Sequence, residues 1–352
     1  MHHAPRPRFA LAVQAVAFCA SLAAAVAEAD TVYVISKTNG GLYSFDSANP
    51  AAISTVAAAA TFNAPSALAL GDDGNLYVGE SPAPGEGDPR ILRYVIGSGS
   101  IAEVVNLSGT AAGYAGDAVY PAAIAFRRGV DGGEMLVGRN PDSVTYAGPV
   151  MAVSGWKTLA PSVTAFTAGV LNASPGLAVS PQTGRLYVSD VVYAGGGQAL
   201  LGTVAEFDGT TSPATLVRSI TTGTLSGPLG LVVSGSTLYS TNPNDGNIYA
   251  TSLASGSSSI IGTALFPFDV GTLAPLSDGD LLAGSLYPAS GQIYRVFTSG
   301  GGAAPLYAFG ASGFGQIGGI VTMAVPEPAT LAIAVGGLVA AVPWVRRRRT
   351  VA

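Results

Sequence analysis

Six polar residues recur at equivalent places along the sequence and are the side chains best placed to do chemistry. Each directly follows a short segment of the form x-Leu-Tyr-Val or a close variant, and together they are Ser36, Glu80, Arg139, Asp190, Asn242 and Ser285. Glu80, Asp190 and Asn242 offer the oxygen ligands that suit calcium better than zinc. The same residue types also cap the turns that leave strands, because their side chains accept hydrogen bonds from nearby backbone N–H groups. The sequence allows both interpretations, and turn capping is the one we favour.

The N-terminal 29 residues have the features of a secretory signal peptide. Arg6 and Arg8 precede an apolar run over residues 9–27, and small-x-small sites at Ala27 and Ala29 follow it. We therefore expect export, with cleavage after Ala27 or Ala29.

Composition excludes several kinds of catalytic site in the exported chain. The only histidines are His2 and His3 and the only cysteine is Cys19, so all three leave with the signal peptide. A Ser–His–Asp or Cys–His site, a His-ligated metal and a disulfide are then excluded. An enzyme on this chain would rely on Asp, Glu, Tyr or metal-bound water.

The exported part is acidic. Residues 30–325 contain 19 acidic and 10 basic residues, a net charge near −9. This charge argues against nucleic acid or anionic lipid as a partner.

The chemistry-bearing residues sit in a repeat, which is the strongest signal of fold in the sequence. Each unit has a short apolar strand, a Gly/Asp/Asn turn, an x-Leu-Tyr-Val strand and a third strand, and most have a fourth. Five units begin near residues 65, 121, 174, 227 and 268. Short strands rich in Val, Ile, Tyr and Leu, grouped in fours at this period, predict the blades of a β-propeller. Two Gly-rich or Pro-rich segments, 81–90 and 191–202, are expected to be loops between second and third strands.

The two ends of this region complete a sixth unit. Residues 31–36, 40–46 and 52–57 match strands two to four, and residues 315–324 match a first strand with nothing after it. Joining them closes the ring and removes the exposed edges of an open sheet. The sequence predicts an all-β, six-bladed propeller closed by both termini over residues 30–323. A β-solenoid or a sandwich is the alternative.

The Pro-x-x-Leu-Ala-Val…Gly-x-Leu-Tyr-Val pattern of these units resembles NHL-type and lactonase-like six-bladed propellers over residues 31–323. The lactonase-like enzymes hold a divalent ion in the central channel with Glu, Asn and Asp side chains. No complete set of such residues can be placed here, so the resemblance implies the fold and not the activity.

The C-terminal residues 324–352 form a separate segment. The motif Val325-Pro326-Glu327-Pro328-Ala329-Thr330 precedes an apolar run over residues 331–345 and four arginines, Arg346, Arg347, Arg348 and Arg349. The arginines are expensive to translocate and are expected to stay cytoplasmic as a stop-transfer cluster. The run is short for a transmembrane helix, and local bilayer thinning and snorkelling arginines cover part of the difference.

This order of motif, helix and basic cluster resembles the PEP-CTERM sorting signal of Gram-negative bacteria that make exopolysaccharide. The resemblance implies processing by an exosortase, a membrane transpeptidase. It implies an inner-membrane anchor before processing and a place at the cell surface or in the extracellular matrix afterwards.

Two functions from different classes are compatible with the sequence. The first, which we favour, is a non-catalytic surface protein whose propeller binds exopolysaccharide or surface proteins. The second is a metal-dependent propeller hydrolase or lyase acting on sugars or lactones, with Glu80, Asp190 and Asp269 as candidate channel carboxylates. No catalytic residue is assigned, and calcium is the only candidate cofactor.

Overall fold

A computed structural model describes most of the region between the two terminal segments. The described residues are 29–83, 85–108, 118–127, 133–139, 148–158, 160–169, 171–194, 198–221, 227–263, 270–285, 291–300, 302–308 and 315–325. They form strands and turns, with no helix among them, and so no described helix is long and apolar enough to cross a membrane. The signal peptide, the motif from Pro326 onward and the predicted helix over 331–345 lie outside these residues and stay predictions.

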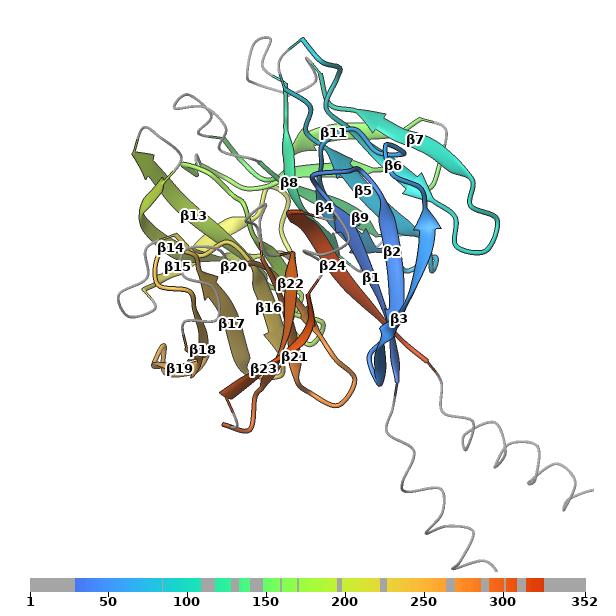
Figure 1. Ribbon diagram of the computed structural model, residues 1–352. Coiled ribbons are helices and arrows are strands. Elements are labelled where there is room, and N and C mark those ends of the chain that lie inside the picture. The colour runs from blue at the N-terminus through green and yellow to red at the C-terminus, as the bar shows by residue number, and fades with distance from the viewer. Residues whose placement is uncertain are drawn as a thin grey trace, which may run out of the picture.

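The described strands form six four-stranded antiparallel sheets, which are the blades of a β-propeller (Figure 1). Blade 1 has the order β24 (Ile317–Ala324), β1 (Asp30–Ser36), β2 (Leu42–Asp46) and β3 (Asn49–Ala57). Blade 2 contains β4 (Pro65–Leu70), β5 (Leu76–Glu80), β6 (Arg90–Tyr94) and β7 (Ile101–Asn106). Blade 3 contains β8 (Pro121–Arg127), β9 (Glu134–Arg139), β10 (Met151–Ser154) and β11 (Ser162–Ala165).

The second half of the ring repeats this order. Blade 4 contains β12 (Leu177–Val179), β13 (Leu186–Ala194), β14 (Gln198–Asp208) and β15 (Thr215–Ile220). Blade 5 contains β16 (Leu231–Ser234), β17 (Thr237–Asn242), β18 (Asn247–Ser252) and β19 (Ser258–Gly262). Blade 6 contains β20 (Val270–Pro275), β21 (Leu281–Ser285), β22 (Gln292–Phe297) and β23 (Gly302–Ala308).

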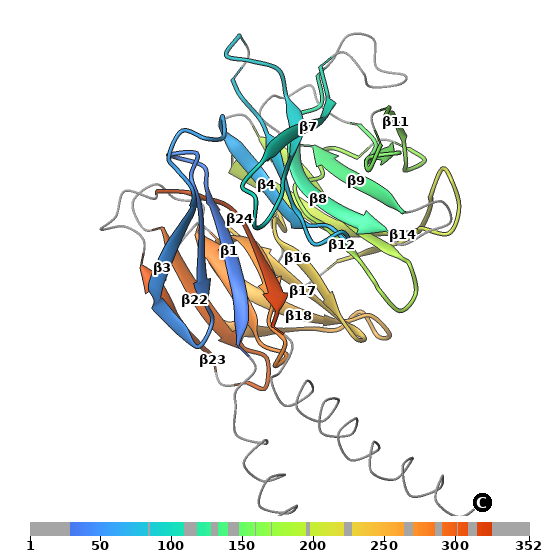
Figure 2. The same ribbon diagram turned by 90° about the vertical axis from the view of Figure 1, so that its right-hand side faces the viewer.

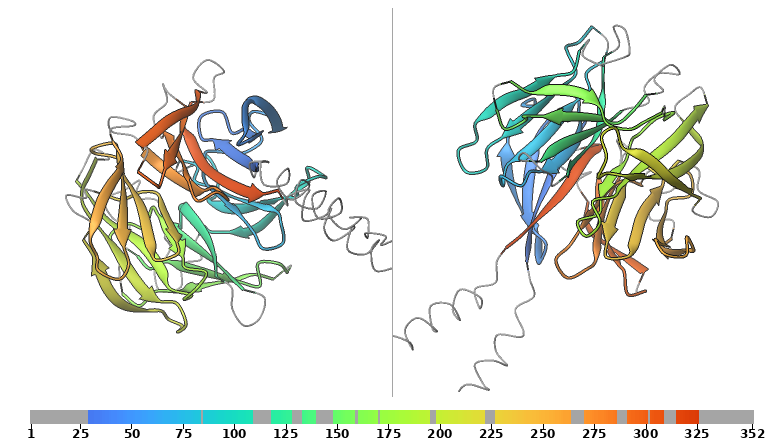
Figure 3. Two further views of the ribbon diagram at one scale, coloured as in Figure 1. Left: turned by 90° about the horizontal axis from the view of Figure 1, so that it is seen from below. Right: turned by 180° about the vertical axis from the view of Figure 1, so that it is seen from behind.

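The first strands of the blades form an inner ring. β24, β4, β8, β12, β16 and β20 each contact the next in this order, and β20 contacts β24 again. The view from below in Figure 3 shows the blades following one another around the molecule, with the red end of the chain returning beside the blue beginning. The prediction of an all-β six-bladed propeller is therefore confirmed.

The core consists of six apolar clusters, one at each junction between neighbouring blades. In β5, Leu76 and Val78 pack toward blade 1, whereas Tyr77 packs toward blade 3. Successive side chains of a strand point to opposite faces, so a strand between two blades buries both faces. This explains why the Leu-Tyr-Val segments are continuously apolar. At the junction of blades 2 and 3, the ring of Tyr77 lies edge-on to Trp156, with 5.0 Å between centroids.

The two ends of the chain close the ring, as the sequence predicted. β24 pairs antiparallel with β1, from Asp30 opposite Ala324 to Ser36 opposite Ile317. Figures 1 and 2 both show the red β24 beside the blue β1. Residues 29 and 325 therefore leave the ring side by side. We call the face of the ring from which they leave the terminus face, and it also carries the turns between first and second strands. Asp30 bonds one such turn directly, because its Oδ2 accepts the backbone N–H of Ser277 at 2.9 Å.

Blade 4 differs from the prediction. Residues 191–202 were expected to form a loop, but β13 runs on to Ala194 and β14 begins at Gln198, so most of the segment is a long hairpin. Val191, Val192 and Tyr193 favour strand, and this preference outweighs the nearby glycines. The fourth strands β11 and β19 were not predicted, because they are short and rich in Ser and Thr.

Candidate functional site

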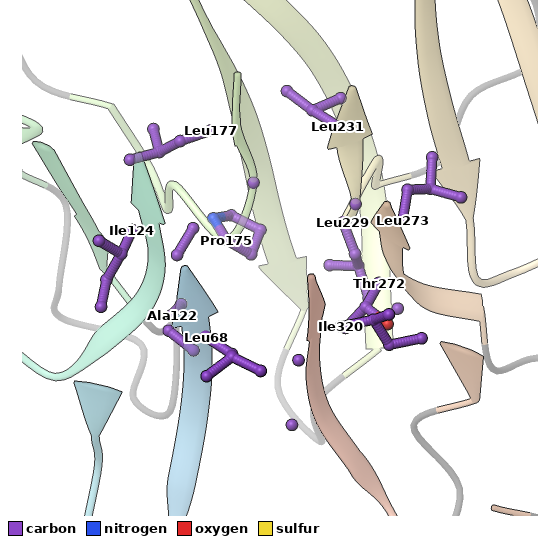
Figure 4. A pocket seen from close by; sticks show the side chains of 17 residues that line it. Leu68, Ala122, Ile124, Pro175, Leu177, Leu229, Leu231, Thr272, Leu273 and Ile320 are labelled. Carbon is purple, nitrogen blue, oxygen red and sulfur yellow. The ribbon is translucent and has the colours of Figure 1, made fainter. Parts of the chain in front are cut away.

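The central channel is narrow, and uncharged residues line it. Six aliphatic side chains, one from the first strand of each blade, line a cavity of about 110 Å³ (Figure 4). They are Leu68, Ile124, Leu177, Leu231, Leu273 and Ile320, and each is at most 9% exposed. None of the residues that line this cavity carries a charge. The channel walls formed by the described residues thus offer no carboxylate for metal binding or acid–base chemistry.

Small residues let the inner strands approach one another closely. A Cβ added to Gly176 of blade 4 would lie 2.0 Å from the carbonyl oxygen of Leu229, at the start of blade 5. A Cβ on Gly318 would lie 2.5 Å from the carbonyl oxygen of Pro65. Contacts this short force the backbone to move, so the glycines set the width of the channel.

The six recurring polar residues do occupy equivalent places in the blades. In the strand registers, Glu80 lies opposite Pro65, Arg139 opposite Pro121 and Ser285 opposite Val270, at the start of each first strand. This end of the strands is opposite the terminus face. Asp190 is partly exposed, whereas the other five are at most 2% exposed.

Glu80 and Asp190 each hold the segment that enters the first strand of their own blade. The Glu80 Oε1 accepts the backbone N–H of Asn63 at 2.7 Å, and Oε2 accepts the Arg90 Nε–H at 2.7 Å. The Asp190 Oδ1 accepts the backbone N–H of Asn172 at 2.8 Å and its Nδ2–H at 3.0 Å. In both blades the residue that follows the carboxylate, Ser81 or Val191, donates its backbone N–H to the carbonyl oxygen of the alanine that follows the asparagine. The repeated Asn-Ala pairs, 63–64 and 172–173, are the sequence signal that would have revealed this tether.

Ser36 and Asn242 cap turns. The Ser36 Oγ accepts the backbone N–H of Asn39 at 3.1 Å, and the Asn242 Oδ1 accepts that of Asn244 at 3.1 Å. The Arg139 backbone N–H donates to the Ser174 Oγ at 2.8 Å, which joins blades 3 and 4. The Ser36 and Asn242 contacts are turn caps, whereas Glu80, Asp190 and Arg139 make contacts of other kinds.

The described residues contain no group of three or more His, Cys, Asp or Glu side chains placed to hold a metal ion. Asp269, the third candidate carboxylate, lies outside them. The calcium ring of Glu80, Asp190 and Asn242 stays a prediction.

A charged groove that the sequence analysis missed lies between blades 4 and 5. The Glu206 carboxylate, 3% exposed, accepts hydrogen bonds from Arg185 Nη1 and from Arg218 Nε, the latter at 2.6 Å. Both arginine side chains remain more than one-third exposed. The Glu206 hydrogen bond raises the pKa of Arg185, so this guanidinium group stays charged. The groove has a volume of about 550 Å³ and opens at the terminus face, where the turns with Thr183 and Ser236 line it.

The architecture defines the chain as a six-bladed β-propeller. No family model matches the sequence, and no curated protein matches it. By contrast, 686 chains of solved structures match the fold, so the fold by itself does not select a function. One of them, in the crystal structure of a nidogen/laminin complex, has a TM-score of 0.59 and is 12% identical. That match covers 85% of this chain and 99% of the other. At this identity the similarity shows the propeller fold alone.

Proposed function

We propose that this chain is an exported β-propeller, sorted by its C-terminal tail to the cell surface or extracellular matrix, where it acts as a non-catalytic binding protein. The observation that carries the proposal is the position of the ends. Ala324 pairs with Asp30 at the terminus face, and the tail motif starts at the next residue, Val325. A tether attached there leaves the ring of blades closed and directs the opposite face away from the membrane.

The partners follow from the tail and from the surface. An exosortase-type enzyme would process the motif between Val325 and Thr330, and exopolysaccharide or surface proteins would be the ligands. Loops on a rigid scaffold commonly carry binding, and the connections from second to third strands, such as residues 81–83 and 85–89, lie on the face opposite the tether. The net negative charge of residues 30–325 disfavours nucleic acid.

Channel chemistry has less support than binding. A metal-dependent hydrolase or lyase was expected to gather carboxylates around the channel. The cavity is instead lined by aliphatic side chains, glycines, alanines, a proline and a threonine. Glu80 and Asp190 are engaged with Asn63, Arg90 and Asn172 within their own blades.

The sorting proposal is tested by replacing Pro326, Glu327 and Pro328 with alanine in a host that contains an exosortase. We expect the variant to keep its unprocessed mass and to stay in the inner membrane, as measured by mass spectrometry and fractionation. The matched control replaces Pro82, Glu86 and Pro89, which have the same residue types but lie in the propeller. Normal processing of the tail variant would contradict the proposal and leave a plain membrane anchor.

The binding proposal is tested separately, by co-sedimenting the exported chain with purified exopolysaccharide of the host. We expect the chain to sediment with the polymer and to be released when the polymer is digested. A chain that stays in the supernatant while its tail is processed normally would contradict the polysaccharide ligand.

A further inference from the structure

We propose that the groove between blades 4 and 5 binds a carboxylate-bearing sugar residue, with the guanidinium groups of Arg185 and Arg218 receiving the carboxylate. The inference rests on the proposed function, the binding of exopolysaccharide, and names the chemical class of polymer and the place where it binds. The groove lies between blades 4 and 5 and opens at the terminus face, whereas the chain leaves that face from blade 1. This site is therefore separate from the loops of the opposite face.

The two arginines are held in place and keep donors available. Glu206 is buried beneath them and fixes one end of each guanidinium group. A guanidinium group has five N–H donors. Within the described residues, the side chain of Arg185 uses Nη1 for Glu206, and that of Arg218 uses Nε for Glu206 and Nη2 for the Leu253 carbonyl. The remaining N–H groups lie on side chains that are 38% and 39% exposed. Planar, preorganised guanidinium groups suit a carboxylate, which they bind through paired hydrogen bonds.

The rest of the groove suits a sugar ring. Thr183 and Ser236 are exposed and bring hydroxyl groups to its rim, and Val217, 44% exposed, adds an apolar wall. Hydroxyl groups match the hydroxyls of a sugar, and the apolar wall matches its C–H face. The volume of about 550 Å³ falls within the range of roughly 300–1,000 Å³ of ligand pockets.

Local charge favours an anion in spite of the acidic chain. Two arginines and one glutamate line the groove, which gives the lining a charge of +1, and Asp208 also lies within electrostatic range of Arg185. Charges farther away than about 8 Å are largely screened at physiological ionic strength, so the groove dominates at contact distance. An extended anionic surface such as a lipid bilayer would meet the net negative charge of the whole propeller. A single carboxylated sugar would not, and the polar rim fits it better.

The test uses the exported full chain, purified in detergent, and isothermal titration calorimetry with trigalacturonate as the probe. We expect trigalacturonate to bind saturably, and the neutral trisaccharide galactotriose to bind at least tenfold more weakly. Arg185→Gln and Arg218→Gln should each weaken trigalacturonate binding at least tenfold, because each leaves one guanidinium group to hold the carboxylate. Arg185→Lys, which keeps the charge, should bind more tightly than Arg185→Gln.

The matched control is Arg90→Gln. Arg90 is 39% exposed and pairs with the buried Glu80 as Arg218 pairs with the buried Glu206, but it lies in blade 2. Arg90→Gln should bind trigalacturonate like the parent. The inference would be overturned if Arg185→Gln and Arg218→Gln bound trigalacturonate as tightly as the parent. It would also be overturned if Arg90→Gln weakened this binding as much as the groove variants do.

Two further arms separate other ligands. Acetate that binds as tightly as trigalacturonate would overturn the assignment of a sugar ligand. The same conclusion would follow if anionic phosphatidylglycerol vesicles bound through Arg185 and Arg218 and trigalacturonate did not bind. If Arg185→Gln sediments with the host polymer as the parent does, the proposed function stands, but the polymer binds outside the groove. Failure of the parent chain to sediment, with trigalacturonate binding intact, would instead contradict the proposed function alone.

Discussion

Glu80 is a buried carboxylate whose two oxygens have different tasks. One oxygen holds the chain as it enters the first strand of blade 2, and the other holds Arg90, whose pKa it raises through their hydrogen bond. A buried carboxylate costs free energy unless its oxygens are hydrogen-bonded. This residue therefore stabilises its blade through the contacts that a bound cation would have to displace.

We expect Glu80→Ala to lower the free energy of unfolding by about 1–3 kcal/mol, because the Asn63 N–H loses its acceptor in a partly buried place. Arg90 is 39% exposed and recovers water, so its contribution to the loss is small. Urea denaturation measures the change. The control is Asp72→Ala, which breaks the exposed Lys157–Asp72 pair and should cost about 0–1 kcal/mol. Equal losses in both variants would contradict the structural role of Glu80.

Calcium provides a second test at this scale. A ligand that binds only the native state raises the melting temperature by mass action. Since the oxygens of Glu80 and Asp190 already accept N–H donors, we expect millimolar calcium to leave the melting temperature of the parent unchanged. A rise in the parent that the double variant Glu80→Ala, Asp190→Ala abolishes would instead establish the cation ring.

At the scale of elements, the pairing of β24 with β1 makes the ring a closed object. A chain that ends at residue 314 lacks β24, so it exposes the edge of β1 and the apolar sides of blades 2 and 6. We expect this truncation to aggregate, because unpaired edges and apolar patches associate. A chain that ends at Val325 keeps β24 and should remain monomeric. Size-exclusion chromatography separates the outcomes, and a monomeric shorter chain with the parent's melting temperature would contradict the importance of closure.

The turn between β4 and β5 carries a pH-dependent contribution. Burial by itself would raise the pKa of Asp73, but hydrogen bonds from Asn75 and Tyr77 outweigh it and hold the pKa below its ordinary value. A carboxyl group with a lowered folded-state pKa stabilises the fold above its unfolded pKa of about 3.9, and this stability is lost as the pH falls through the lower folded value.

We therefore expect Asp73→Asn to be less stable than the parent at pH 7, and the difference in unfolding free energy to narrow below about pH 4. Urea titrations at several pH values measure this difference. Tyr77→Phe, which removes one donor to Asp73, should weaken the same pH dependence. A difference between parent and Asp73→Asn that is constant from pH 7 to pH 2.5 would show that the Asp73 charge does not matter.

The sequence predicted the strands better than it predicted the groove. The repeated Leu-Tyr-Val segments indicated the blades, because both faces of these strands are buried. Glu206 and Arg218 lie opposite each other in neighbouring strands, and a bulge after Glu206 shifts the register between β14 and β15. The spacing of the residues does not reveal such a bulge, so the contact between the two side chains could not be predicted. Arg185, in a turn, reaches the same carboxylate only through the pairing of β13 with β14.

At the scale of the whole molecule, the ring is a scaffold with its charged features at the faces and a narrow channel lined by uncharged residues. If the chain binds rather than reacts, the purified protein should not hydrolyse lactones, sugar esters or polyuronides, with or without calcium. The aliphatic lining of the channel is the physical reason. Product release, followed by chromatography, measures turnover. Calcium-dependent turnover that Glu80→Ala and Asp190→Ala abolish together would establish the hydrolase or lyase instead.

The side-by-side exit of the chain ends also has a mechanical consequence. In a protein anchored by its tail, tension reaches the ring at Ala324 and acts along the axis of β24. The bonds between antiparallel strands run perpendicular to the strands, and the pairs from Asp30–Ala324 to Ser36–Ile317 stand side by side along that axis. The load is therefore borne in shear, by all of these pairs at once, and not by peeling them apart one after another.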